Sequence, residues 1–344
     1  MRVLLVKTSS LGDVVHTAPA ITEAMRARPD LEIDWAVEES FSEIVRLHPQ
    51  VRAVHDVAVR RWRRKPLASR TWSEVAALRR TLRAERYDLT IDAQGLLKSL
   101  FIGRLAGAPV HGFDRTSARE AAAPFGYANR YAVGRDRHAI ERTRLLFAGV
   151  LGYPAAAGSP EYGLRPPPAP DFTRGRDNLA ALLHGTTWSS KRWPAPYWTD
   201  LARQLVKRGY LPVLPWSDAA ERTVAETVAA AAPPSLVLPR SSLIEIAGLL
   251  AASRLVIGVD TGLMHLAVAF GVPTVSLFGS TSPDLTGPVG AASTIVRAAI
   301  ECAPCGRRLC PRVPRGGEPP CHATIAPDRV LAGVEPRGLV SQAG

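Results

Sequence analysis

Short apolar runs alternate with longer helical patterns along most of this 344-residue chain. In the first half we predict strands at RVLLVK, EIDWAVE, VRAVHDV, YDLTIDA, VHGFD and RYAVG, and helices at TAPAITEAMRAR, WSEVAALRRTLRAER and HAIERTRLLFAGVLG. In the second half we predict strands at ALLHG, YLPVLP, SLVLP, RLVIGVD and PTVSLFG, and helices at YWTDLARQLVKRG, ERTVAETVAAAA and SLIEIAGLLAAS. Strands that are separated by helices form βαβ units, so the chain is predicted to be an α/β protein with parallel sheets.

A segment rich in Pro, Gly and Ala interrupts this alternation near the middle of the chain. We predict a linker over 156–172, between a first α/β domain at 1–155 and a second at 173–325, with a helix or tail over 326–344. Ligands of such folds bind at the carboxyl ends of the strands, so we expect the functional site there, in a cleft between the two halves.

The composition indicates a globular protein with an anionic partner. No stretch approaches the roughly 18 uncharged apolar residues of a membrane span, and charged residues cut the first apolar run too short for a signal peptide, so we expect a cytoplasmic protein. Lys and Arg number 43 against 31 Asp and Glu, a net charge of +12. This excess favours nucleic acid, anionic lipid or a phosphorylated substrate, but the chain has no nucleic-acid-binding motif.

The first predicted strand ends in the turn SSLGD, which has neither of the two common glycine-rich phosphate loops. Asp13 occupies the place where such a loop would hold a phosphate. On the pattern alone, an acid at this position is typical of a helix cap.

Two loops of the second half carry groups that suit a diphosphate. Asp260, Thr261 and Gly262 follow the strand RLVIGV, a helix is predicted to begin at about Leu263, and His265 lies on its first turn. The amide groups at a helix N-terminus bind anions. The alternative is an ordinary N-cap with a surface histidine.

The second loop, TTWSSK, follows the strand ALLHG. Thr186 and Thr187 supply hydroxyls and Lys191 supplies a compact positive charge, which suits a phosphate leaving group. A turn with a solvated lysine is the alternative, and the presence of two such loops in one half favours the phosphate-binding interpretation.

The run VRRWRRKPLASR contains six Lys and Arg and no acid. Because Trp62 lies within the run and Trp72 just after it, the pattern fits anionic sugars or a lipid headgroup surface. A solvated surface or a nucleic-acid patch is the alternative, although no recognised nucleic-acid-binding module supports the second.

All four cysteines fall within 302–321, with the spacing C-x2-C-x4-C-x10-C and His322 next to the last. This spacing allows a structural zinc site at Cys302, Cys305, Cys310 and Cys321. Reduced thiols in an ordered Pro-rich loop are the interpretation that we favour for a cytoplasmic protein.

The motifs together resemble one family. VKTSSLGDVVHTAPAI, EIDWAVEESF, VAVRRWRRK, DAQGLLKS, TSARE, RHAIERTR, GTTWSSKRWP, LPWS and VDTGLMHL occur in this order within residues 1–290. The chain thereby resembles the ADP-heptose:lipopolysaccharide heptosyltransferases, and within them the heptosyltransferase I branch most closely. The resemblance implies the GT-B architecture of two Rossmann-like domains that face across a cleft. It also implies an inverting transfer from ADP-heptose to Kdo-lipid A that needs no metal and no cofactor.

The resemblance also implies roles for individual residues. Asp13 would be the catalytic base, with its pKa lowered by a helix N-terminus, and Lys191 would act on the leaving diphosphate. The acceptor side would comprise Ser10, Gly12, Arg60, Arg61, Arg63, Arg64 and Arg119. The donor side would comprise Thr186, Thr187, Lys191, Glu221, Ser241, Asp260, Thr261, Gly262 and His265.

Two rival functions remain open. The cysteine-containing segment resembles a tail of other family members, including heptosyltransferase II, which favours a heptose acceptor instead of Kdo. A non-catalytic module that binds a nucleotide or an anionic glycolipid is the second rival, whereas an oxidoreductase is disfavoured because G-x-G-x-x-G is missing. Contact with the inner membrane surface through the basic run is a further expectation, and the oligomeric state stays open.

Overall fold

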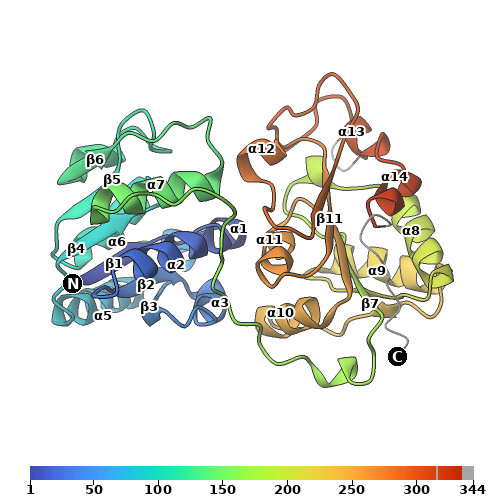
Figure 1. Cartoon of the computed structure of the whole chain (residues 1–344), viewed down its shortest axis with the longest axis horizontal. Coiled ribbons are helices and arrows are strands. Elements are labelled where there is room, and N and C mark those ends of the chain that lie inside the picture. The colour runs from blue at the N-terminus through green and yellow to red at the C-terminus, as the bar shows by residue number, and fades with distance from the viewer. Residues whose placement is uncertain (315–316, 335–344) are drawn as a thin grey trace. The chain divides into compact units, whose positions relative to one another are not determined.

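The computed structural model describes residues 1–314 and 317–334. The chain divides into two compact units, Met1–Arg165 and Pro166–Gly344, which Figure 1 colours from blue to green and from green to red. The division falls inside the segment 156–172. Each unit contains one six-stranded parallel sheet.

The sheet of the first unit has the strand order β3-β2-β1-β4-β5-β6. Its strands are β1 (Arg2–Val6), β2 (Glu32–Glu38), β3 (Val51–Val57), β4 (Leu89–Asp92), β5 (Val110–Phe113) and β6 (Asn129–Tyr131). The strand order reverses between β1 and β4, as in a Rossmann fold. The loops that follow these two strands therefore open a crevice at the carboxyl edge of the sheet.

Helices cover both faces of this sheet. They are α1 (Leu11–Val15), α2 (Ala18–Ala27), α3 (Ser42–Val45), α4 (Val59–Arg64), α5 (Ser69–Ala84), α6 (Leu97–Leu105) and α7 (Ala139–Leu151). Because side chains of a strand alternate, Val3 and Leu5 join the core with α2 and α7, whereas Leu4 and Val6 join the core with α4, α5 and α6. Because β1, the strand that contains these four residues, is buried on both faces, its sequence from Val3 to Val6 is apolar without interruption.

The second unit repeats this topology with the strand order β12-β11-β10-β7-β8-β9. Its strands are β7 (Leu179–Leu183), β8 (Leu211–Leu214), β9 (Leu236–Val237), β10 (Leu255–Val259), β11 (Thr274–Phe278) and β12 (Ser293–Arg297). Here β10 and β7 are the neighbours at which the strand order reverses. The predicted fold class, α/β with two Rossmann-like domains, is confirmed.

The helices of the second unit are α8 (Ala195–Lys207), α9 (Ala219–Ala231), α10 (Leu243–Ala252), α11 (Gly262–Ala269), α12 (Pro283–Thr286), α13 (Pro320–Ala323) and α14 (Pro327–Ala332). Leu182 and Ile257 share a core with Trp198 and Leu201 of α8, and α14 adds Val330 to it. The segment predicted as a helix or tail thus contributes to this core up to Val334, and residues 335–344 lie outside the described part of the chain.

Several elements differ from the prediction. The pattern after SSLGD contains two helices, α1 and α2, instead of one. The prediction also did not include β12, which is a half-buried edge strand, or the helices α4 and α6. None of the helices in the described part of the chain combines the length and hydropathy that a bilayer span requires.

Candidate active site

Asp13 lies on α1, directly after the loop that leaves β1. Its side chain is only 13% exposed. Oδ2 accepts a hydrogen bond from the backbone N–H of Ser10 (2.8 Å), which is the geometry of a helix cap. Oδ1 instead accepts from Nη2 of Arg119 (2.7 Å) and lies 3.8 Å from Nζ of Lys7. The carboxylate thus caps its helix with one oxygen and meets two cations with the other.

The cations determine the charge state of this carboxyl group. Burial raises the pKa of Asp13, but Lys7, Arg119 and the Ser10 amide together hold that pKa below its usual value. Asp13 is therefore ionised at neutral pH. The direction agrees with the expectation from the sequence, and the two cations act in addition to the amide at the helix N-terminus.

Sequence reasoning missed Lys7, which is buried at the carboxyl end of β1. Its Nζ donates to the Ala93 carbonyl (2.9 Å), and burial lowers the pKa of Lys7 to about 8, against the opposing attraction of Asp13. A cavity of about 30 Å³ adjoins the side chains of Lys7 and Asp13 and is also lined by Arg119 and Arg142. The only signal in the sequence was a lysine placed directly after an apolar strand.

A hydrogen-bond network from β4 fixes the loop that carries Asp13. Oε1 of Gln94 accepts from the N–H (2.7 Å) and the hydroxyl (2.9 Å) of Thr8, and Gln94 also donates to the Ser9 carbonyl. Asp92 in turn accepts from the N–H of Gln94 (2.9 Å) and from the Tyr127 hydroxyl (2.6 Å). Sequence reasoning assigned no role to these residues of DAQG, although the motif itself was recognised.

The basic residues predicted for the acceptor side have different surroundings. Arg119 contacts Asp13, as described. Arg61 pairs with Glu39 (3.0 Å) and Glu74 (2.7 Å), so two carboxylates already occupy its guanidinium group.

The remaining arginines lie on α4. Arg60 stacks over the Phe41 ring at 5.2 Å. Within residues 1–314 and 317–334, Arg63 and Arg64 have no carboxylate partner, and both are exposed. Ser10 contributes the amide that binds Asp13, and Gly12 is buried within α1.

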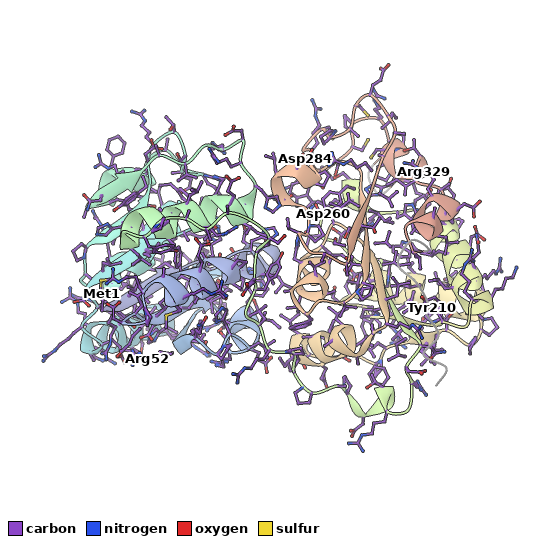
Figure 2. The ribbon with its side chains drawn as sticks, viewed as in Figure 1. Met1, Arg52, Tyr210, Asp260, Asp284 and Arg329 are labelled. Carbon is purple, nitrogen blue, oxygen red and sulfur yellow. The ribbon has the colours of Figure 1, made fainter. Side chains whose placement is uncertain are left out.

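In the second unit, Asp260 and Lys191 form a buried ion pair. Asp260, labelled in Figure 2, directly follows β10, and Lys191 ends the turn Ser189–Lys191 after β7. Nζ of Lys191 lies 2.6 Å from Oδ2 of Asp260, and the Thr281 hydroxyl donates to the same oxygen (2.6 Å). His265 Nε2 lies 3.9 Å from Oδ1. Burial opposes ionisation, but His265 and Lys191 hold the pKa of Asp260 well below its usual range.

A cavity of about 160 Å³ lies beside the loops that carry Lys191 and Asp260. Four residues predicted for the donor side line it, namely Thr186, Thr187, Glu221 and Thr261. Gly262 follows as the first residue of α11. The predicted Ser241 is not among the lining residues in the described chain, and its hydroxyl donates to the Pro239 carbonyl (2.9 Å) in the segment before α10.

Glu221 reaches this cavity only because residue 185 is glycine. Its carboxylate accepts from the N–H (2.8 Å) and the hydroxyl (2.7 Å) of Ser217. A Cβ on Gly185 would lie 2.4 Å from Oε1 of Glu221, so any side chain there would displace the carboxylate.

The four cysteines are free thiols that line one further cavity of about 240 Å³. Among residues 1–314 and 317–334, no group of three or more His, Cys, Asp or Glu is arranged to hold a metal ion. Burial raises the pKa of Cys321, and electrostatic interaction with the three other cysteines raises it further. A hydrogen bond from the backbone N–H of His322 opposes this shift and lowers the pKa. Backbone carbonyls of the same segment accept hydrogen bonds from Ser189 and Ser190, so this segment lies beside the turn that carries Lys191.

Comparisons with known proteins agree with this geometry. A family described as glycosyltransferase family 9 (heptosyltransferase) matches residues 75–314. The chain is 45% identical over 346 residues to lipopolysaccharide heptosyltransferase 1 of Pseudomonas aeruginosa, with 97% of each chain covered. It is 40% identical over 302 residues to lipopolysaccharide heptosyltransferase 1 of Escherichia coli, covering 88% of this chain and 95% of that protein.

A solved structure extends the likeness to the fold. The E. coli heptosyltransferase WaaC with ADP-2-deoxy-2-fluoro heptose is similar with a TM-score of 0.82 and 36% sequence identity, covering 97% of this chain and 99% of that chain. Each of the two Rossmann-like sheets has a largely buried aspartate near its carboxyl edge, and the sequence match extends along nearly the whole chain. These observations lead to one conclusion. The chain belongs to glycosyltransferase family 9, the heptosyltransferases.

Proposed function

We propose that this chain transfers L-glycero-D-manno-heptose from ADP-heptose to the Kdo of Kdo-lipid A, with inversion, during synthesis of the lipopolysaccharide inner core. The observation that carries the proposal is the Asp13 carboxylate, which two cations keep ionised beside a small cavity. The relatives that match most of the chain are named lipopolysaccharide heptosyltransferase 1, which favours Kdo over a heptose acceptor.

On the acceptor side, Asp13 acts as the general base. An ionised aspartate is a weak base, but it accepts the proton as the acceptor hydroxyl becomes acidic in the transition state. Arg119 holds Oδ1 of Asp13, and Arg63 and Arg64 offer guanidinium groups without carboxylate partners in the described chain. Arginine binds a carboxylate through two parallel hydrogen bonds, which suits the acidic Kdo sugars.

On the donor side, the second unit receives the ADP-heptose. Bond cleavage builds positive charge on the sugar and negative charge on the leaving diphosphate. Lys191, the hydroxyls of Thr186 and Thr187, and the amides at the start of α11 stabilise that negative charge. Glu221 lies in the same cavity, where it binds the ribose or the adenine. The proposed reaction assigns no step to a metal or a cofactor.

A transfer assay with ADP-heptose tests this function. Acceptors that carry Kdo alone are compared with acceptors that carry Kdo and one heptose. Product is expected from the first acceptor. Product from the second alone would assign the chain to the heptosyltransferase II reaction, and no consumption of ADP-heptose with either would favour the binding module.

The variant Asp13→Asn removes the proposed base and keeps the size of the side chain. Transfer is expected to fall by roughly 10²–10⁴-fold, the usual contribution of general-base catalysis, while the Kd for ADP stays within about twofold. Both are measured, by the transfer assay and by calorimetry. Asp171→Asn, which changes an exposed acid that pairs with Arg174, is the matched control and should keep full activity. Near-normal turnover of Asp13→Asn would refute the assignment of the base.

The pKa of Asp13 should depend on Lys7. The ammonium group favours the ionised carboxylate and so lowers its pKa, and the variant Lys7→Met should therefore raise that pKa. The carboxyl ¹³C resonance of Asp13, assigned by its loss in Asp13→Asn, reports the midpoint during a pH titration. Lys207→Met changes an exposed lysine of the second unit and should leave the midpoint in place. An unchanged midpoint in Lys7→Met would show that the ammonium does not act on Asp13.

We further propose that this chain contacts the cytoplasmic face of the inner membrane. Residues 59–104 carry twelve Lys and Arg against four Asp and Glu, a net +8 of the chain's +12. The exposed large apolar side chains of the first unit are Leu67, Trp72, Leu97, Phe101 and Phe125. The first four lie within the same basic stretch, and Phe125 precedes Gly126, which contacts Leu100 of α6. Exposed apolar and basic groups together suit an anionic bilayer.

Vesicle sedimentation tests this contact. The chain should sediment with vesicles that contain phosphatidylglycerol and not with pure phosphatidylcholine. The double variant Arg63→Ser with Arg64→Ser should weaken binding by roughly 30-fold, since each of the two basic residues contributes about 1 kcal/mol near an anionic surface. Lys207→Ser with Arg254→Ser removes two exposed charges from the second unit as a control. Equal binding to both kinds of vesicle, or equal loss in both double variants, would contradict the proposal.

A further inference from the structure

Two cationic side chains pack against the indole ring of Trp188. Nζ of Lys191 lies 4.5 Å from the ring centroid, and the guanidinium carbon of Arg308 lies 5.2 Å from the same centroid. Trp188 directly follows the threonines that line the 160 Å³ cavity. Arg308 belongs to the segment 302–312, which we call the Cys loop because it contains three of the four cysteines.

The backbone of the Cys loop is tied to the turn that carries Lys191. The Arg308 carbonyl accepts from the Ser190 N–H (3.3 Å) and from the Ser189 hydroxyl (3.4 Å). The Arg307 carbonyl accepts from the Ser190 hydroxyl (2.6 Å). These contacts fix the start of the Arg308 side chain relative to Lys191, and Trp188 then orients its guanidinium group by a cation–π interaction.

The two cations differ in their charge balance. The ammonium of Lys191 already has the Asp260 carboxylate as its partner at 2.6 Å. Arg308 has no carboxylate partner anywhere in residues 1–314 and 317–334, and its side chain is exposed. No carboxylate of the described chain therefore balances the positive charge of the Arg308 guanidinium group, which can attract an anion to this turn.

We propose that Arg308 is a further donor-binding residue, which contacts the diphosphate of the nucleotide sugar beside Lys191. The inference rests on the proposed ADP-heptose donor. The guanidinium fork matches two phosphate oxygens at once, whereas Lys191 offers a point charge. The Cys loop thereby gains a role in the site, because it presents this arginine.

The variant Arg308→Met tests the proposal, since it removes the charge and keeps an unbranched side chain against Trp188. The main-chain carbonyl that binds the turn is unchanged by this substitution. The Kd for ADP, measured by calorimetry, should rise roughly tenfold, as for the loss of one charge-assisted hydrogen bond. The affinity for adenosine, measured by ligand-observed NMR, should not change, because adenosine lacks the diphosphate. Arg308→Lys should recover part of the ADP affinity.

Arg312→Met is the matched control, because Arg312 lies in the same loop and, in the described chain, makes no cation–π contact with Trp188 and no hydrogen bond to the turn Ser189–Lys191. It should bind ADP as the wild type does. An unchanged Kd for ADP in Arg308→Met, or an equal loss of ADP and adenosine binding, would overturn the role of Arg308. If the wild-type chain bound no ADP, the donor assignment itself would fail, and this inference with it.

Discussion

Reversal of the strand order in a parallel sheet forces neighbouring loops to opposite faces and leaves a crevice at the carboxyl edge. Both units use this constraint in the same way. In the first, the loops after β1 and β4 bring Asp13 and Gln94 to one place, and in the second the loops after β7 and β10 bring Lys191 to Asp260. A carboxylate that is buried there costs several kcal/mol unless a cation meets it, so each aspartate requires its lysine.

The two ion pairs nevertheless differ in ways that suit different chemistry. Asp13 keeps one oxygen in its helix cap and shares the other between Arg119 and Lys7, with Lys7 at 3.8 Å. Asp260 holds Lys191 at 2.6 Å and receives a hydroxyl from Thr281 on the same oxygen. The first arrangement keeps an acid charged with its lysine at the longer distance. The second arrangement fixes a cation within a buried ion pair.

Much of the fold was predictable from the sequence, because strands buried on both faces are apolar throughout, as Val3 to Val6 illustrate. Exposed apolar side chains obscured α6, since Leu97 and Phe101 remove the polar face that marks a helix. The loops carrying Asp13 and Lys191 were predictable from their motifs. Lys7 was not, because its burial depends on a contact with Ala93, which lies 86 residues away along the chain. Local patterns carry no record of such a contact.

The Lys191–Asp260 ion pair has a consequence for the reaction cycle. A diphosphate that contacts Lys191 must compete with a carboxylate that already binds the ammonium at 2.6 Å. In the proposed reaction, that competition would reduce the affinity for donor and product alike. When ADP departs, the ammonium returns to an anion of the protein and is never left buried without a counterion. In the proposed reaction, Asp260 would thus replace the phosphate as the partner of Lys191 whenever the site is empty.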